Sequence, residues 1–316
     1  MVNKTITVAS VQMASGDWDF QHNMDRAERL IRQAAAQGAN LVLCPELFMM
    51  PYFCIDQNFE HLELAEPYEG NARIAHFAKL AGDLGIVLPI GFFERAGNTA
   101  FNSVAVADAD GKVLGVYRKT HIPDGPGYTE KFYFTPGDTG FKVWDTQFGR
   151  IGIAICWDQW YPETARSMAL MGAEILCFPT IIGSEPHNAG MDTAPHWQRT
   201  MQGHAAANML PVVAANRIGS ETGRGNGTPN SKGLTGVFYG SSLIADHTGA
   251  KVQEANRTDE TILIHSFDLD TIRRERQSFG FFRDRRPEMY QTLLTSDGKN
   301  SRPDLRPAGA SPNAML

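Results

Sequence analysis

A chain of 316 residues, 42% apolar and 20% charged, can bury a sizeable core, which excludes wholesale disorder. Its formal net charge of -6 argues against a nucleic-acid-binding protein, because such proteins usually carry a basic surplus. The N-terminus lacks the pattern of a signal peptide and no apolar run approaches a membrane span, so we expect a cytoplasmic protein with neither a nucleic-acid nor a membrane partner.

The first half of the chain alternates strand-like and helix-like runs. Residues 6–13 contain β-branched residues at a period near two, which predicts a strand. Residues 23–40 are rich in Ala, Arg, Leu and Gln, and Gly38 lies where a helix would end. The next predicted elements are a strand at 41–45, a helix at 71–85 and three strands within 86–120, the last two joined by the turn signal Asp110-Gly111.

The second half repeats this alternation after a looser stretch at residues 121–140. The predicted elements are strands at 142–146 and 150–156, a helix at 161–173, a strand at 174–180, a helix at 196–209, a strand at 211–219, a loop at 220–236, and strands within 241–255 and 261–269. The basic stretch from Arg273 to Arg286, with phenylalanines interleaved, is typical of a solvated helix face or a subunit contact.

Hairpins interrupt the alternation of strands and helices in both halves. We therefore expect an α/β fold whose sheets are mixed and covered by helices, not a purely parallel doubly wound sheet. We expect a single domain over residues 1–296 and a loosely held C-terminal tail over residues 297–316, where the chain becomes polar and rich in proline.

The four cysteines are Cys44, Cys54, Cys156 and Cys177. Their spacing fits neither a zinc-binding pattern nor a C-x-x-C redox pair, and four cysteines in so long a chain do not make a disulfide scaffold. We therefore predict reduced thiols, as in a cytosolic protein, and no metal site.

Three reactive side chains follow predicted strands: Glu46, Lys119 and Cys156. A nucleophilic cysteine needs a base or a nearby cation, and a carboxylate in a dry pocket can take the thiol proton. A lysine can stabilise an oxyanion, as can a backbone N–H at the start of a helix, here that of Trp157. Taken singly, each residue fits a non-catalytic role better: a cysteine that ends an apolar strand is more often part of the core, a glutamate after a proline is often a surface residue, and a lysine at a strand end is usually solvated.

The three segments together resemble the Glu-Lys-Cys signature of the nitrilase superfamily, the carbon–nitrogen hydrolases, over nearly the whole chain. The resemblance implies a four-layer α-β-β-α sandwich with two mixed sheets, no metal or cofactor, and a homo-oligomer. It implies that Glu46 is the general base, Lys119 the oxyanion stabiliser and Cys156 the nucleophile. A second family glutamate matches Glu130 in the segment YTEKFYF, where it would orient Lys119 and the substrate amide.

Segments 117–146, 152–186 and 196–219 are similar to those of the N-carbamoylputrescine amidases within this superfamily. The implied reaction is attack of the Cys156 thiolate on a ureido carbonyl, release of ammonia, and hydrolysis of a carbamoyl thioester to carbon dioxide and a free amine. The amine would be putrescine, which places the reaction in polyamine biosynthesis. Met49 and Met50 depart from the family pattern, in a loop whose shape bears on which amine the pocket accepts.

The substrate tail is predicted to be cationic. Relatives that act on N-carbamoyl-D-amino acids carry an arginine pair shortly after the cysteine, whereas this chain has the segment Trp157 to Trp160 without arginine. A cation needs acids and aromatic faces. The candidate acids are Asp124 and Glu185, and the candidate walls are Tyr52, Trp157 and Trp160. Asp124 also fits a simple turn, and the tryptophans also fit a core.

Two alternatives remain open from the sequence. One is a hydrolase of another ureido or amide substrate, such as an N-carbamoyl amino acid or N-carbamoyl-β-alanine. The other is a non-catalytic binding protein on the same fold, although none of the three signature residues is lost. A papain-like pair of Cys156 and His121 is disfavoured because such enzymes need no glutamate and lysine at two further strand ends, so His121 is predicted to be structural.

Overall fold

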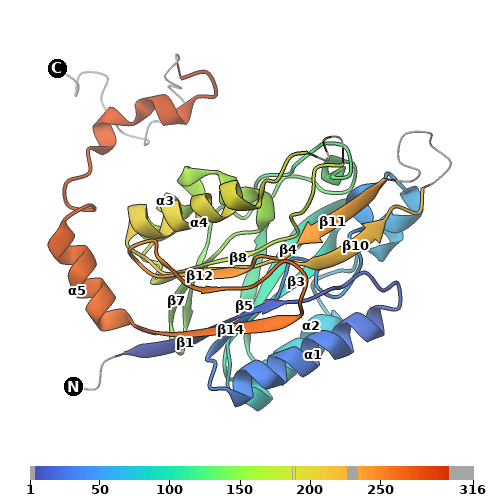
Figure 1. Ribbon diagram of the computed structural model, residues 1–316, viewed down its shortest axis with the longest axis horizontal. Coiled ribbons are helices and arrows are strands. Elements are labelled where there is room, and N and C mark those ends of the chain that lie inside the picture. The colour runs from blue at the N-terminus through green and yellow to red at the C-terminus, as the bar shows by residue number, and fades with distance from the viewer. Residues whose placement is uncertain (1–3, 187, 189, 226–233, 299–316) are drawn as a thin grey trace. The chain divides into compact units, whose positions relative to one another are not determined.

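Two layers of β-sheet lie face to face at the centre of the computed structural model, which describes residues 4–186, 188, 190–225 and 234–298 (Figure 1). Their strands form four hydrogen-bonded sheets, of three, two, six and three strands. The strands are β1 Thr5–Gln12, β2 Leu41–Leu43, β3 Leu88–Ala96, β4 Thr99–Ala107, β5 Val113–Arg118, β6 Val143–Thr146, β7 Gly149–Ile153, β8 Ile175–Pro179, β9 Val212–Ala215, β10 Ile218–Thr222, β11 Thr235–Tyr239, β12 Leu243–Ala245, β13 Lys251–Glu254 and β14 Thr261–Asp268. The α-helices are α1 Phe20–Ala36, α2 Ala72–Leu84, α3 Pro162–Leu170, α4 Ala194–Asn208 and α5 Leu269–Phe279. The short 3₁₀ helices are η1 Phe53–Ile55, η2 Phe59–Leu64, η3 Glu130–Phe132, η4 Cys156–Trp160, η5 Pro287–Met289 and η6 Gln291–Leu294.

The first layer consists of two three-stranded sheets, β14-β1-β2 and β3-β4-β5. Strand β1 pairs antiparallel with β14 and parallel with β2. A parallel bridge between Leu41 and Val87 leads from β2 towards the antiparallel meander β3-β4-β5. Glu46 follows β2 and Lys119 follows β5. Both residues are therefore positioned by strands of this layer.

The second layer contains a six-stranded sheet with the strand order β13-β12-β9-β8-β7-β6. Its central strands β7, β8 and β9 are parallel, and its outer pairs are antiparallel. The two sheets touch through β1 and β9, where the hydroxyl of Ser10 donates to the carbonyl of Ala214 at 2.9 Å. Both parallel and antiparallel pairs occur, so the prediction of mixed sheets is confirmed.

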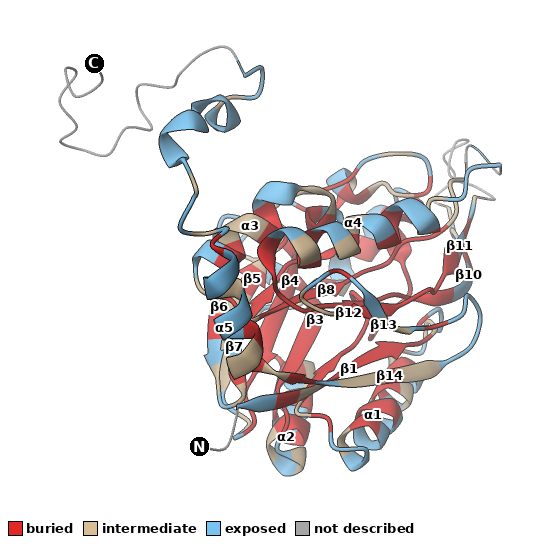
Figure 2. Ribbon diagram, turned by 60° about the vertical axis from the view of Figure 1, so that its left-hand side comes forward, coloured by how far each residue is buried: buried red, intermediate tan, exposed pale blue. Residues whose placement is uncertain are grey.

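Helices cover the outer face of each sheet. Helices α1 and α2 pack on the first sheet and α4 on the second, with α3 beside α4 (Figures 1 and 2). In α1 the buried residues recur at helical spacing, and Asp19 caps the first turn by accepting from the N–H of Gln21. Burial of such stripes fixes the order helix, sheet, sheet, helix, which confirms the predicted α-β-β-α sandwich (Figure 2).

Two details differ from the sequence prediction. The strand expected at 211–219 is two strands, β9 and β10, separated by Asn216 and Arg217, whose side chains turn inward to form hydrogen bonds. Strand β11 begins inside the loop expected at 220–236. It forms because its residues pair antiparallel with β10, an interaction that the local sequence pattern does not predict. Residues 226–233 of that loop lie outside the described residues.

The chain divides into two compact units, residues 1–273 and 274–316. The first contains both sheets and helices α1 to α4. The second contains the end of α5, η5 and η6, so the basic stretch predicted as a helix face is helical over its first part. The boundary at residue 296 stays a prediction, and residues 299–316 of the expected tail lie outside the described residues. Among the described residues, no helix is both long and apolar enough to cross a membrane.

Candidate active site

Glu46 follows β2 and is buried where the two sheets meet. One of its carboxylate oxygens, Oε1, accepts from Asn102 Nδ2 at 2.6 Å and from Lys119 Nζ at 2.8 Å. The other, Oε2, accepts from the backbone N–H of Ile181 at 3.0 Å. Leu47, the next residue, has a φ of 44°, in the left-handed region that L-residues disfavour. Three donors therefore fix the carboxylate, and a strained turn aims it inward.

Arg217 holds this turn from the opposite sheet. Its guanidinium is buried and donates to the carbonyls of Leu47 and Met50 at 3.1 and 2.9 Å. The charge is balanced by Glu221, whose Oε1 lies 2.7 Å from Arg217 Nη1. The sequence pattern does not indicate this role of Arg217, which lies in a predicted continuous strand, because the carbonyl of Leu47 that it binds is 170 residues away along the chain.

Lys119 lies between two carboxylates. Its Nζ is 2.8 Å from Glu46 Oε1 and 2.6 Å from Glu130 Oε2, and its side chain is fully buried. Burial alone would lower the pKa of an ammonium, but the charges of Glu130 and Glu46 outweigh it and raise the pKa of Lys119 well above its usual value. Lys119 therefore remains a cation at neutral pH.

Glu130 opens η3 and completes the cluster. Burial raises the pKa of its carboxyl to about 7, opposed by the charge of Lys119 and reinforced by that of Glu46. The hydroxyl of Tyr52 donates to Glu130 Oε1 at 2.9 Å. Two acids sharing one buried ammonium leave an excess negative charge, which explains why one of them holds its proton more tightly than usual.

Cys156 lies at a sharp turn between β7 and η4. Its φ is 44°, and its Sγ donates to the carbonyl of Ile181 at 3.5 Å. Burial and the charge of Glu46 raise the pKa of the thiol well above its usual value, so the resting group is a protonated thiol. Ile181 thus bonds to both reactive groups, since its N–H is bound to Glu46 and its carbonyl faces the thiol.

Asp158 anchors the turn that carries Cys156. It is fully buried and accepts from the N–H of Ile155 at 3.0 Å and from the hydroxyl of Tyr117 at 2.6 Å. Its other oxygen accepts from the N–H and from Nδ1 of His121, at 2.9 and 2.7 Å. His121 therefore has the structural place that the sequence predicted. Asp158 itself was not singled out, because an aspartate near a helix start is usually a surface cap.

A pocket of about 250 Å³ opens onto Cys156 and Glu130. Four of the predicted substrate-binding residues line it: Asp124, Trp157, Trp160 and Glu185. Tyr128, Ile181 and Ile182, which the sequence did not indicate, also line it.

Tyr52, the fifth predicted substrate-binding residue, is not among the residues that line this pocket. Its ring is buried, and it reaches the site only through its hydrogen bond to Glu130. Glu46 and Lys119 are also absent from the lining, since both side chains are buried beside Glu130.

The pocket carries negative charge. Its lining contains the carboxyl groups of Asp124, Glu130 and Glu185, and no lysine or arginine among the described residues. Aromatic faces from Tyr128, Trp157 and Trp160 complete the walls. Such a lining suits a small organic cation better than a carboxylate.

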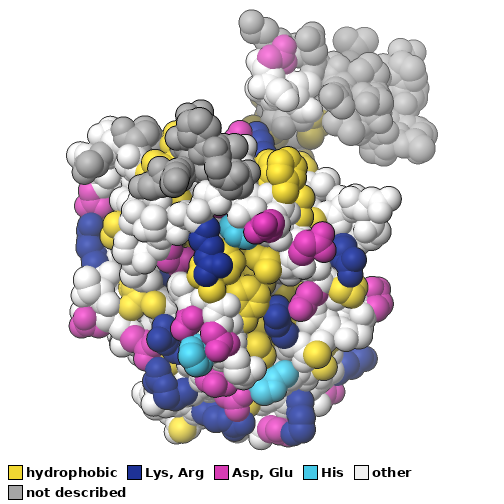
Figure 3. All heavy atoms as spheres, turned by 90° about the vertical axis from the view of Figure 1, so that its right-hand side faces the viewer, with side chains coloured by type: hydrophobic (Ala, Val, Ile, Leu, Met, Phe, Trp, Pro, Cys, Tyr) yellow, Lys and Arg dark blue, Asp and Glu magenta, His cyan; other side chains and the backbone are white. Residues whose placement is uncertain are grey.

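The four cysteines, Cys44, Cys54, Cys156 and Cys177, are free thiols and all are buried. Over the described part of the chain, no group of three or more His, Cys, Asp or Glu side chains is placed to hold a metal ion. On the face shown in Figure 3, acidic and basic side chains are interspersed around a central group of hydrophobic side chains.

Comparison with known proteins gives concordant matches. A family model for carbon-nitrogen hydrolases matches residues 7–277. The N-carbamoylputrescine amidase of Arabidopsis thaliana is 54% identical over 295 residues, which cover 93% of this chain and 97% of that protein. The citrullinase of Francisella tularensis is 50% identical over 289 residues, 92% of this chain and 98% of that protein. The crystal structure of a carbon-nitrogen hydrolase from Helicobacter pylori G27 is 38% identical, with a TM-score of 0.85, and covers 92% of this chain and 99% of its own.

Proposed function

The chain belongs to the carbon-nitrogen hydrolase family, and we propose that it is a cysteine-dependent amidohydrolase that cleaves N-carbamoylputrescine to putrescine, ammonia and carbon dioxide. The observation that carries this proposal is the buried Glu46–Lys119–Glu130 cluster beside Cys156, at the end of a pocket lined by acids and aromatic rings. Relatives with this substrate in their names are more than half identical over most of the chain, which supports the choice of amine.

The first half of the reaction makes a covalent intermediate. Glu46 takes the thiol proton of Cys156, and the sulfur bonds to the ureido carbonyl carbon. The carbonyl oxygen becomes an oxyanion, which the Lys119 ammonium and the backbone N–H of Trp157 stabilise. The bond to the terminal nitrogen then breaks, Glu46 returns its proton to that nitrogen, and ammonia leaves a carbamoyl thioester on Cys156.

The second half releases the amine. Glu46 takes a proton from a water molecule, whose oxygen adds to the thioester carbon. The carbon–sulfur bond breaks, the sulfur is reprotonated, and a carbamate is released that decomposes to carbon dioxide and putrescine. Glu130 positions Lys119 throughout, because the two side chains are joined at 2.6 Å.

The distal end of the substrate decides between this reaction and that of the citrullinase relative. N-carbamoyl-β-alanine carries a carboxylate at the far end, and citrulline carries a carboxylate beside an ammonium, so either substrate would need a cationic partner for its carboxylate. The pocket presents Asp124 and Glu185 instead, and the described lining contains no lysine or arginine. A terminal ammonium is therefore the better match, with a carboxylate-bearing ureido compound as the second candidate.

A substrate panel tests the proposal. Ammonia release is measured with N-carbamoylputrescine, citrulline and N-carbamoyl-β-alanine. The highest kcat/KM is expected for N-carbamoylputrescine. A higher kcat/KM for either carboxylate substrate would overturn the choice of amine but keep the hydrolase, whereas turnover of none of the three, with binding retained, would favour a non-catalytic binding protein.

Charge-removing variants locate the ammonium site. Glu185→Gln and Asp124→Asn are expected to raise KM for N-carbamoylputrescine by roughly 10–100-fold, since a hydrogen bond to a charged group contributes about 1.5–3 kcal/mol. Glu163→Gln, an exposed glutamate on α3 outside the pocket, is the matched control. Unchanged KM in both pocket variants would show that neither acid pairs the substrate.

We further propose a homo-oligomer, as the superfamily resemblance implies. Leu170 and Met171, at the end of α3, are exposed apolar side chains that such an interface could cover. Light scattering coupled to size exclusion measures the mass directly, and a monomer at micromolar concentration would contradict the proposal. A cytoplasmic location stays a prediction, which the four free thiols support.

A further inference from the structure

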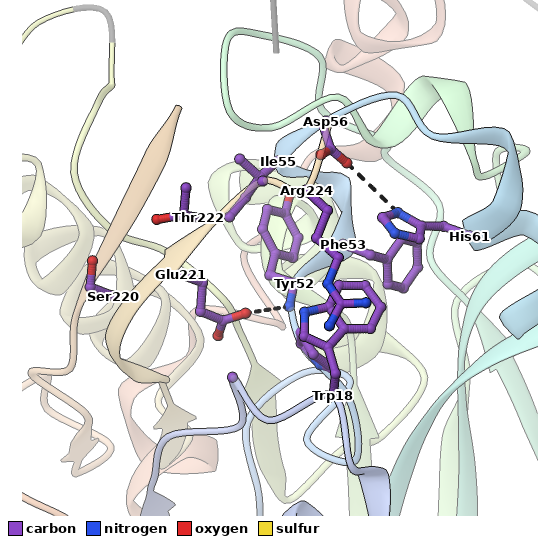
Figure 4. A pocket seen from close by; sticks show the side chains of 13 residues that line it. Trp18, Tyr52, Phe53, Ile55, Asp56, His61, Ser220, Glu221, Thr222 and Arg224 are labelled. Atoms are coloured by element: carbon purple, nitrogen blue, oxygen red, sulfur yellow. Dashed lines mark hydrogen bonds and ion pairs between the residues drawn. The ribbon is translucent and has the colours of Figure 1, made fainter. Parts of the chain in front are cut away.

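A second pocket of about 130 Å³ lies apart from the candidate active site (Figure 4). Its walls come from the loop after β1, the segment around η1 and η2, and strand β10 with the residues that follow it. It shares no lining residue with the pocket that opens onto Cys156. Its volume is several times the roughly 10–15 Å³ that one water needs by the same measure, so a molecule of several heavy atoms fits.

Arg224 supplies a cation at the exposed side of this pocket. Its guanidinium lies 3.9 Å from the ring centroid of Trp18, a cation–π contact. Among the described residues, Arg224 has no carboxylate partner. Stacking on an aromatic ring uses the flat face of a guanidinium and leaves its N–H donors, which point outward in the plane, available to bind an anion.

Asp56 supplies an acid at the buried side. Its Oδ2 accepts from the N–H of Gly225, but its Oδ1 is buried with no hydrogen-bond partner among the described residues. The nearest basic group is His61, whose Nδ1 is 3.7 Å from that oxygen (Figure 4). Burial lowers the pKa of His61, so the imidazole is neutral at pH 7 and does not balance the acid.

Glu221, the other acid of the pocket, is already satisfied. Its Oε1 binds the buried guanidinium of Arg217 at 2.7 Å. Its Oε2 accepts from the N–H of Tyr52 at 2.6 Å (Figure 4). Two groups are therefore left over: one carboxylate oxygen, Asp56 Oδ1, which has no hydrogen-bond partner among the described residues, and the Arg224 guanidinium, whose described contact is the Trp18 ring. A buried acid of this kind is costly unless something pairs with it.

We propose that this pocket binds a small zwitterion, namely an α-amino acid with a short side chain. The ligand ammonium pairs with Asp56 and the ligand carboxylate with Arg224, while Trp18 and Phe53 enclose the carbon atoms. A simple amine would meet the unpaired charge of Arg224, and a simple carboxylate would meet that of Asp56. Only a molecule with both charges satisfies the two groups at once.

Binding is tested by calorimetric titration of the full chain with glycine, L-alanine and L-serine, and with methylamine and acetate as single-charge probes. At least one amino acid is expected to bind the wild-type protein, and to bind at least tenfold tighter than methylamine or acetate. Cys156→Ala should bind it equally, because the two pockets share no residue. No binding of any amino acid at millimolar concentration, or equal binding of either single-charge probe, would overturn the proposal.

Two variants locate the site. Arg224→Gln and Asp56→Asn should each weaken amino-acid binding at least tenfold, whereas Arg199→Gln, an exposed arginine on α4, should not. Circular dichroism checks that the buried Asp56→Asn change leaves the fold intact, and Arg224→Gln keeps the test valid if it does not. Unchanged affinity in Arg224→Gln would place any observed binding elsewhere and refute the site.

Discussion

Replacing Asp158 by asparagine tests whether this buried acid positions the nucleophile. Asp158 accepts four hydrogen bonds, two of them from backbone N–H groups, those of Ile155 and His121. An asparagine has one acceptor oxygen and one donor NH₂, so in either orientation the NH₂ faces one of these backbone donors. A buried donor left without an acceptor costs about 1–3 kcal/mol, and the remaining bonds also lose their charge assistance.

The expected loss in the free energy of unfolding is therefore about 2–4 kcal/mol, measured by denaturant titration. Ile155 directly precedes Cys156, and His121 lies two residues after Lys119, so the same change loosens nucleophile and oxyanion donor relative to each other. We expect kcat for ammonia release to fall at least tenfold while KM changes little, since the substrate pocket is unaltered.

Tyr117→Phe is the matched control for this change. It removes one of the four donors to Asp158 and leaves both backbone bonds, so a loss of about 1 kcal/mol and a near-normal kcat are expected. An Asp158→Asn enzyme with the unfolding free energy and kcat of the wild type would refute the positioning role. A loss of stability alone, with normal kcat, would show that the anchor is structural and not tied to the chemistry.

Three further predictions concern the catalytic cluster. Cys156→Ala should abolish ammonia release while the circular dichroism spectrum stays native, and residual turnover near the wild-type rate would contradict covalent catalysis. Lys119→Met should lower the free energy of unfolding by about 3–5 kcal/mol, because it leaves Glu46 and Glu130 buried without their cation; a melting temperature equal to wild type would argue against that charge balance. The pKa of Glu130 is raised from 4.5 to about 7 in the folded protein, so the native state binds more protons than the unfolded state between these values, and stability should fall as the pH rises from about 4.5 to 7. Glu130→Gln should flatten this part of a melting-temperature profile against pH, and an identical slope in both proteins would assign the dependence to another group.

The sequence was informative where a reactive side chain ends an apolar run. Glu46, Lys119 and Cys156 follow β2, β5 and β7 closely, and the pattern of the runs locates those ends. The layered fold also follows from local pattern, because the buried stripe of α1 and the alternation of strands are short-range signals.

Residues that act across the fold could not be found in this way. The local pattern predicts a strand residue at Arg217, although its side chain holds the turn after Glu46 from another layer. Ile181 contributes only backbone groups, which every residue has, so no side-chain pattern marks it. Strand β11 depends on pairing with β10, which no local pattern shows. Tyr52 is predicted at the pocket wall because it is aromatic, whereas tertiary packing buries its ring and directs its hydroxyl to Glu130.

The two residues with φ of 44° in the candidate active site, Leu47 and Cys156, have a consequence for protein engineering. Leu47 and Cys156 occupy a backbone conformation that disfavours L-residues by roughly 1–2 kcal/mol each and that glycine adopts freely. Cys156 is both a residue in this strained conformation and the proposed nucleophile, so a substitution that relieves the strain also removes the thiol. A library of variants selected only for thermal stability should therefore accumulate inactive proteins with substitutions of Cys156. Selection for stability must include an activity measurement in every round.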